Sequence, residues 1–249
     1  MDIVHKKNML LAAYILLALV TATGVIAYFG WDMQLACSFY VPGQGFPTGN
    51  RQPWHFLYRF GVWPAVLMGG SAGAVFLCSF IRTDLIPFRR QALFLALLLI
   101  IGPGILANSI FKDHWGRPRP RQVVEMGGAM PFYQPWQPGP APKNASFPAG
   151  HPTAAFYLSA PYFILCRRRR RQALLWLLGG FIYGCIMGAA RIVQGGHFLS
   201  DVIWSAGFVY LTALLLADWL LPLPKSPSSA GVPLKAPMKR PWRPRPARG

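Results

Sequence analysis

Long runs of apolar residues, separated by short clusters of charge, constrain this 249-residue chain more than any other feature. Hydrophobic residues make up 53% of the sequence and charged residues only 13%, which is typical of a membrane protein. A helix needs about 20 residues to cross about 30 Å of hydrocarbon. Six runs approach that length, at residues 9–29, 57–80, 91–111, 152–166, 172–190 and 198–221. The sequence therefore predicts an all-α, polytopic membrane protein, a bundle of six transmembrane helices.

Two of these runs have unusual features. The fourth is short and contains Pro152 and Pro161, so neighbouring helices must satisfy the backbone groups that the prolines free. The first follows Lys6 and Lys7 and precedes small residues, as a signal peptide does, but its apolar run is long for that role. We expect both runs to be spans.

Basic residues cluster on one side of this predicted bundle. With six spans, the same side receives Lys6 and Lys7, Arg82, Arg89 and Arg90, five arginines at 167–171, and seven basic residues after Leu221. The positive-inside rule assigns that side to the cytoplasm, so we expect both termini there. The asymmetry also explains most of the net charge of +18 without a nucleic-acid partner. Loops 30–56 and 112–151 and the turn at 195–197 then lie on the outward face.

We expect one six-span domain over residues 1–221 and a separate tail over 222–249. The tail is rich in proline and basic residues and poor in apolar ones, so it cannot bury enough surface to fold. We predict that it is a disordered cytoplasmic segment. The four cysteines include no CxxC pair, and we predict neither a structural disulfide nor a cysteine metal site.

His197 and Asp201 stand four residues apart, where Gly195-Gly196 precedes the last apolar run. On a helix this spacing places both side chains on one face, so the carboxylate can hold one imidazole nitrogen while the other faces a substrate. Such a pair is often structural. Arg191 lies close in the sequence, however, and its guanidinium suits an anion such as phosphate.

A second cluster lies in the loop before the fourth run, on the same predicted face. Lys112, Arg117 and Arg119 stand in one short stretch with His114, although Arg117 could instead pair structurally with Asp113. The simplest interpretation is a solvated basic loop, but the positive-inside rule disfavours such a loop on the outward face. The cluster therefore predicts a bound anion.

Together these clusters resemble the three signatures of the type 2 phosphatidic acid phosphatase (PAP2) superfamily, in the same order. The matching segments are Lys112, six residues and Arg119-Pro120; then Pro148-Ala149-Gly150-His151; then Ala190-Arg191 through His197 and Asp201. The six-span arrangement extends the resemblance to most of the chain outside the tail. It implies a membrane phosphatase with an outward-facing active site.

The resemblance implies that fixed cations bind the phosphate. Lys112, Arg119 and Arg191 would clamp the transferring group, which spreads its charge over three oxygens. The backbone amide of Gly150 would add a further donor. We expect no metal and no other cofactor, because the cations replace them.

The resemblance also assigns the covalent and proton-transfer steps. His197 would be the nucleophile and form a phosphohistidine that water hydrolyses. Asp201 would accept a hydrogen bond from the other ring nitrogen of His197 and fix its tautomer. His151 would protonate the leaving alkoxide.

Two positions depart from the family pattern. Ala149 and Ala190 stand where the second and third signatures usually have serine. Each lost hydroxyl is a hydrogen bond worth roughly 0.5 to 3 kcal/mol. The activity would then be slower, and a phospholipid-binding relative without turnover is the alternative.

The expected substrate is a phosphorylated lipid at head-group depth on the outward face of a bacterial inner membrane. The stretches Lys112 to Arg121 and Gln194 to His197 look most like the branch that includes lipid A phosphatases. Undecaprenyl pyrophosphate and phosphatidylglycerol phosphate remain alternatives, and the oligomeric state is open. Haloperoxidases share the anion cage but are soluble, and a transporter would carry more charge inside its spans.

Overall fold

The computed structural model describes residues 3–141 and 145–221, so the predicted tail at 222–249 lies outside the described residues. Within these two ranges every regular element is helical, apart from two isolated β-bridges, and the all-α prediction is confirmed. In chain order the elements are α1 (Ile3–Phe29), α2 (Trp31–Cys37), η1 (Pro47–Asn50), α3 (Trp54–Phe60), α4 (Trp63–Cys78), η2 (Thr83–Phe88), α5 (Arg89–Leu99), η3 (Ile100–Phe111), α6 (Lys112–His114), η4 (Pro120–Gln122), η5 (Val124–Met126), α7 (Gly150–Phe156), η6 (Tyr157–Ser159), α8 (Pro161–Leu165), α9 (Arg170–Val193) and α10 (Leu199–Leu220).

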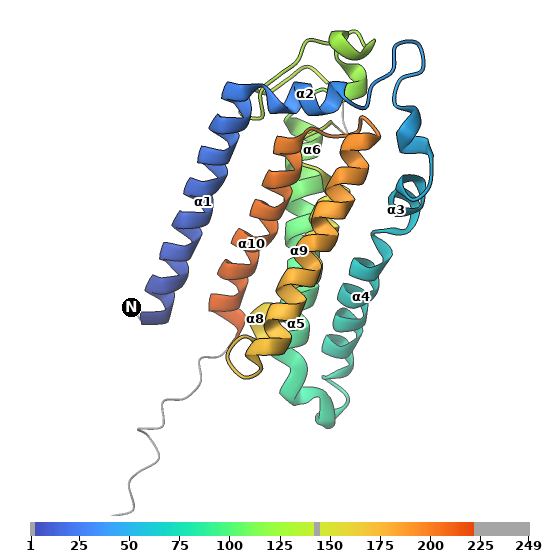
Figure 1. Cartoon of the computed structure of the whole chain (residues 1–249). Helices are drawn as coiled ribbons and strands as arrows, with labels where there is room; N and C mark the ends of the chain where they lie inside the picture. The colour runs from blue at the N-terminus through green and yellow to red at the C-terminus, as the bar shows by residue number, and fades with distance from the viewer. Residues whose placement is uncertain (1–2, 142–144, 222–249) are drawn as a thin grey trace, which may run out of the picture.

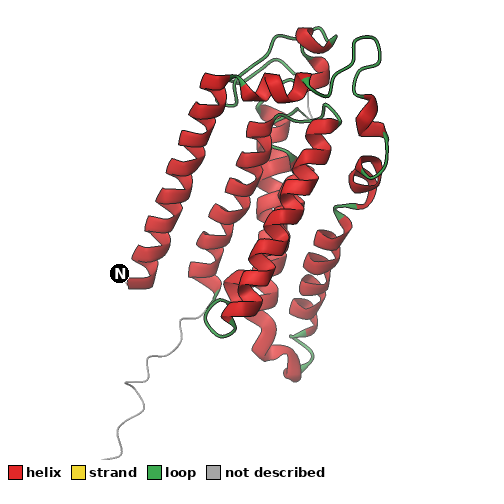
Figure 2. Ribbon diagram, in the orientation of Figure 1, coloured by secondary structure: helices red, strands yellow, loops and turns green. Residues whose placement is uncertain are grey.

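Five helical stretches in the described part of the chain are long and apolar enough to cross a membrane, and they run along one bundle (Figure 1, Figure 2). They are His5–Phe29, Trp54–Cys78, Thr83–His114, Arg170–Val193 and Leu199–Leu220. Each overlaps a predicted span. The third includes η3, which is wound as a π-helix and contains Pro103. Proline donates no backbone hydrogen bond, so a widened turn is a common solution in such a helix.

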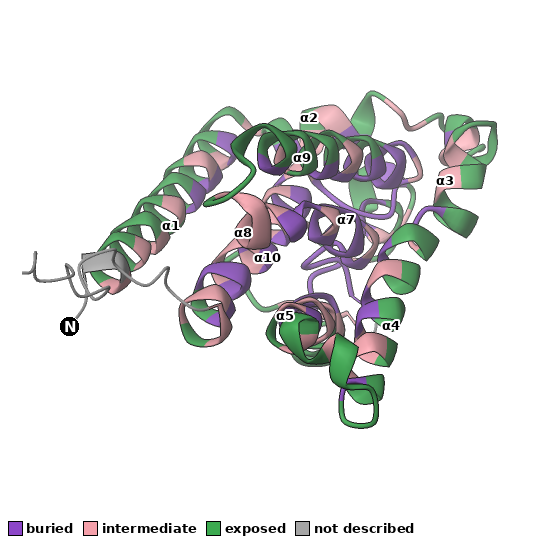
Figure 3. Ribbon diagram, turned by 90° about the horizontal axis from the view of Figure 1, so that it is seen from below, coloured by how far each residue is buried: buried purple, intermediate pink, exposed green. Residues whose placement is uncertain are grey.

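The fourth predicted span is a broken helix rather than a regular one. Residues 150–165 form three short pieces, α7, η6 and α8, and the segment is shorter than the other five stretches. It lies in the middle of the bundle and α7 is largely buried (Figure 3). The hydroxyls of Ser205 and Tyr157 donate to the carbonyl oxygens of Ala149 and Leu95, at 2.9 Å each. These hydrogen bonds tie the segment to α5 and α10 inside the bundle.

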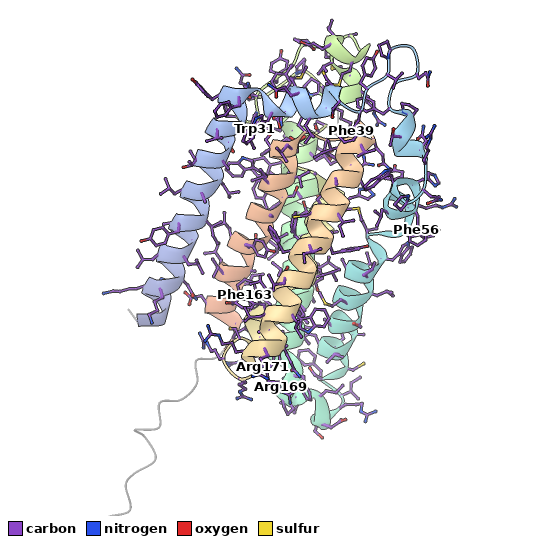
Figure 4. The ribbon with its side chains drawn as sticks, viewed as in Figure 1. Trp31, Phe39, Phe56, Phe163, Arg169 and Arg171 are labelled. Carbon is purple, nitrogen blue, oxygen red and sulfur yellow. The ribbon has the colours of Figure 1, made fainter. Side chains whose placement is uncertain are left out.

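The two ends of the bundle differ in composition. At one end, which we call the site end, α2 lies across the helices together with the loop after α6 (Figure 1). Figure 4 places Trp31 and Phe39 there and Arg169 and Arg171 at the opposite end. The basic clusters and the candidate catalytic loops thus lie at opposite ends of the molecule, as the charge pattern predicted.

Close packing holds α7 against α9. A Cβ atom added at Gly184 would overlap the ring of Phe156, and one added at Gly180 would overlap Ser159. Glycine at these two positions lets the helices approach closely. This contact fixes α7, which begins next to His151, relative to the end of α9, which carries Arg191.

Candidate active site

His197 lies in the turn between α9 and α10 and is almost completely buried, with 1% of its surface exposed. Gly195 makes this turn with a positive φ of 61°. The Nδ1 atom of His197 lies 2.6 Å from the carbonyl oxygen of Ser146. A carbonyl oxygen only accepts hydrogen bonds, so Nδ1 carries the proton and Nε2 keeps its lone pair. Burial lowers the pKa of His197 to about 3, and the ring is therefore neutral at pH 7.

Asp201 lies beside the Nδ1 side of His197, as predicted, but does not form the predicted direct hydrogen bond. Its Oδ2 atom lies 3.8 Å from Nδ1 of His197, which is too far for a hydrogen bond. The Ser146 hydroxyl and the Phe198 backbone N–H donate to that oxygen instead, at 2.5 and 2.8 Å. The predicted direct His197–Asp201 hydrogen bond is therefore wrong. Ser146 lies between them, since its carbonyl orients the imidazole and its hydroxyl contacts the carboxylate.

Arg117 is the centre of a buried polar cluster behind the histidine. Its side chain is fully buried and forms ion pairs with Asp32 at 2.8 Å and with Asp201 at 2.5 Å. Arg117 also donates to the Ser200 hydroxyl at 2.8 Å, and its guanidinium lies 4.6 Å from the centre of the Phe198 ring. Arg117 is thus committed to protein partners rather than to a substrate anion.

The predicted phosphate clamp lies in front of the histidine. Arg119 and Arg191 are buried, with 8% and 6% of their surfaces exposed. Nη1 of Arg191 donates to Oε1 of Gln194, while Nε has no hydrogen-bond partner among the described residues. A buried guanidinium N–H without a partner is costly unless a ligand satisfies it. Gln194 is itself fixed, because its amide donates to the carbonyl oxygens of Gly49 and Trp54 at 3.2 and 3.0 Å.

Tyr58 of α3 contacts both Arg191 of the predicted phosphate clamp and His151, the predicted acid. Its ring stacks on His151 with 5.1 Å between centroids, and the Arg191 guanidinium lies 4.6 Å from its centre. Burial, and then the positive charges of Arg191 and Lys112, lower the pKa of His151 to about 4. His151 is therefore neutral at pH 7 when the site holds no anion.

Gly150 brings the first and second signatures together. A Cβ atom at this position would lie 3.4 Å from Nζ of Lys112 and 2.6 Å from Oδ1 of Asn108. The Asn108 amide donates to the carbonyl oxygen of Pro103 at 2.6 Å, so the π-helical segment holds it in place. The absence of a side chain at residue 150 therefore lets the lysine approach the start of α7.

The structure thus gathers all seven predicted site residues at one end of the bundle. Six of them surround one region: Lys112, Arg119, Gly150, His151, Arg191 and His197. Asp201 lies behind His197. The three cations and two neutral imidazoles can bind a tetrahedral anion and attack it. Within residues 3–141 and 145–221, no group of three or more His, Cys, Asp or Glu side chains could hold a metal ion.

The alanines that depart from the family pattern are both fully buried. Ala149 precedes α7 and offers no side-chain cap to that helix, while Ala190 lies in the last turn of α9. A serine at residue 149 would be at a position where hydroxyls commonly cap helices. The Ala149 carbonyl already accepts from Ser205 and Thr153, so the backbone remains fixed without that hydroxyl.

Replacing Gly196 with alanine is expected to lower kcat/KM for phosphate release by about tenfold to a hundredfold. The added Cβ would lie 2.5 Å from Nη2 of Arg191, so the guanidinium must move although its charge is kept. Gly179→Ala in α9 is the control, because its Cβ would meet nothing within 4 Å. Equal activity of the two variants in a phosphate-release assay would show that the position of Arg191 does not matter.

Comparison with known proteins gives the same family as the three signatures. The sequence profile of the PAP2 superfamily matches residues 91–223. A lipid A 4'-phosphatase of Francisella tularensis subsp. novicida is 38% identical over 134 residues, which cover 53% of this chain and 60% of the relative. A protein of the same name from Rhizobium leguminosarum is 36% identical over 131 residues, covering 51% of this chain and 55% of the relative.

The matches cover only part of these proteins. The chain spans about half the length of the curated relatives it matches. Among solved structures, a transmembrane PAP2-type phosphatidylglycerolphosphate phosphatase from Bacillus subtilis gives a TM-score of 0.49 at 17% identity, covering 84% of this chain and 94% of that one.

Proposed function

Because this chain belongs to the PAP2 superfamily, we propose that it is an integral-membrane phosphatase that removes phosphate from a lipid head group. The observation that carries the proposal is the geometry of His197. A neutral imidazole with its proton fixed on Nδ1 presents Nε2 to a region that buried cations surround. A nucleophilic nitrogen with its lone pair free, next to a site for a tetrahedral anion, is what phosphoryl transfer requires.

In the proposed reaction, the lone pair on Nε2 of His197 attacks phosphorus while the bond to the lipid oxygen breaks. Lys112, Arg119 and Arg191 hold the non-bridging oxygens and balance their charge. His151 gives its proton to the leaving alkoxide, which departs as an alcohol. Water then attacks the phosphohistidine, His151 takes a proton from that water, and inorganic phosphate leaves with His197 neutral again.

His151 must gain a proton before it can act as an acid. The negative charge of the bound substrate would favour this protonation. Its pKa of about 4 reflects burial and surrounding positive charge, which a bound dianion would offset. Binding of sulfate, which does not titrate near neutral pH, is therefore expected to raise this pKa and to take up a fraction of a proton at pH 6. Calorimetry in two buffers of different ionisation enthalpy measures that uptake. The His151→Gln variant should bind sulfate without it, and equal uptake in both proteins would exclude His151 as the proton acceptor.

We propose a lipid A type substrate, because the relatives at 36% to 38% identity are named lipid A 4'-phosphatase. Undecaprenyl pyrophosphate and phosphatidylglycerol phosphate remain alternatives. We further propose a bacterial inner-membrane location with the site end outward and the basic clusters in the cytoplasm. The distribution of basic residues supports this orientation.

Phosphate release by the purified full chain in detergent tests the proposal. Lipid A, undecaprenyl pyrophosphate, phosphatidylglycerol phosphate and phosphatidic acid are compared with a chelator present. We expect release, with lipid A preferred and no loss on chelation. Loss on chelation would contradict the metal-free mechanism. Lipid binding without any release would favour a non-catalytic relative instead.

A further inference from the structure

A closed charge cluster lies directly behind the nucleophile. It contains Asp32 from α2, Arg117 from the loop after α6 and Asp201 from α10, which are 2%, 0% and 0% exposed. One guanidinium nitrogen of Arg117 contacts Asp32 and another contacts Asp201. Ser200 completes the cluster, because its backbone N–H and hydroxyl both donate to Asp32, at 2.8 and 2.5 Å.

The charges in this cluster do not cancel. Two carboxylates and one guanidinium leave a net charge of −1, and the site is too buried for water to screen it. Asp201 lies 3.8 Å from His197, so the imidazole is exposed to this excess negative charge. Without the negative charge of Asp32, the positive charge of Arg117 would cancel the negative charge of Asp201.

In the proposed reaction, His197 becomes positively charged once Nε2 bonds to phosphorus while Nδ1 keeps its proton. Negative charge next to the ring stabilises that state and the transition state leading to it. We infer that Asp32 is a positioning residue for phosphoryl transfer, which neutralises Arg117 so that the charge of Asp201 remains available to His197. The inference rests on the proposed function. Asp32 lies in none of the three signatures and outside the matched residues 91–223.

The Asp32→Asn substitution tests this role, because it removes the charge with little change in shape. With lipid A in detergent micelles, we expect kcat to fall at least about tenfold while KM changes less than about threefold, since the clamp in front of His197 is intact. Single-turnover assays should show slower formation of the phosphohistidine. Equal kcat for variant and wild type would overturn the inference, as would equal losses in kcat and in affinity.

Two controls separate charge from packing. Asp218→Asn alters a carboxylate that accepts a hydrogen bond from Asn8 of α1 at the opposite end of the bundle, so it weakens α1 packing without touching the site. Ser200→Ala removes hydrogen bonds from the cluster but keeps its charge, so its effect on kcat measures what those hydrogen bonds contribute. Asp218→Asn should keep kcat within about threefold of wild type, and Ser200→Ala should lose less kcat than Asp32→Asn. A loss in either variant that matches Asp32→Asn would make the role of Asp32 merely structural.

A charge swap provides the decisive variant. In Asp32→Asn with Ser200→Asp, the carboxylate moves to a residue whose hydroxyl already contacts Arg117 at 2.8 Å. We expect this double variant to recover kcat relative to Asp32→Asn alone. If Asp32→Asn does not fold, the double variant is compared with wild type, and a folded double variant with kcat more than about a hundredfold below wild type contradicts the inference. If the wild-type protein releases no phosphate from any lipid, the proposed function is wrong, and the inference about Asp32, which rests on it, is wrong as well.

Discussion

Replacing His197 with alanine is expected to lower kcat by about 10⁴-fold to 10⁶-fold, as loss of a catalytic nucleophile does in other hydrolases. The side chain is neutral and oriented by the Ser146 carbonyl. His151, the other neutral imidazole of the site, is assigned to proton transfer in the proposed reaction. Phosphate release from lipid A measures the loss, and a ³²P-labelled lipid quenched in base detects the phosphohistidine directly. The variant should form none.

His114→Ala is the control for that experiment. His114 belongs to the same end of the molecule, is exposed, and contacts the Ile110 carbonyl oxygen at 2.8 Å through Nδ1. It should retain wild-type activity. If His197→Ala retains more than about a tenth of the wild-type rate, His197 is not the nucleophile.

Replacing Arg117 with methionine is expected to destabilise the protein by about 3 to 5 kcal/mol. The substitution leaves Asp32 and Asp201 as unpaired carboxylates in a sealed site, which costs far more than the lost contacts themselves. Thermal unfolding in detergent at a fixed scan rate measures the effect as a lower Tm. Many molecules of this variant should fail to fold at all.

Arg82→Met is the matched surface control, because Arg82 pairs with Asp84 with both side chains more than 60% exposed. Its effect should stay below about 1 kcal/mol. Combining Arg117→Met with Asp32→Asn should restore part of the lost stability, since one buried charge is then removed. Equal Tm values for the Arg82 and Arg117 variants would show that the buried cluster contributes nothing to stability.

Most of the helical framework follows from the sequence, because the length and composition of an apolar run are local properties. Five runs predict five helical stretches, and the clusters of basic residues predict which loops share an end. The break in the fourth run is harder to predict. Pro152 and Pro161 indicate a disturbed helix, but the contacts that hold the segment inside the bundle, such as the hydrogen bond from Ser205, come from residues distant in the sequence.

The sequence predicts those site residues that carry charge or stand at the spacing of a motif. It does not predict contacts between residues that only the fold brings together. The Ser146 backbone carbonyl that holds His197 cannot be identified from the spacing of side chains, so the sequence assigned that role to Asp201. Tyr58 was predicted only as part of an apolar span. Asp32 offered one signal, an acidic residue directly after a long apolar run, but its partner is 85 positions away.

The segment from α7 to α8 is broken into short pieces and is not among the five stretches long and apolar enough to cross a membrane in the described residues. It is held by later parts of the chain, since the Ser205 hydroxyl of α10 donates to the Ala149 carbonyl beside the helical donor Thr153. For a six-span topology, we expect this segment to enter the bilayer together with α9 and α10 rather than by itself. A nascent chain that stops before α10 is then expected to keep the arginines at 167–171 on the same side of the membrane as the loop that ends at His151. We therefore predict that the topology is completed only near the end of translation.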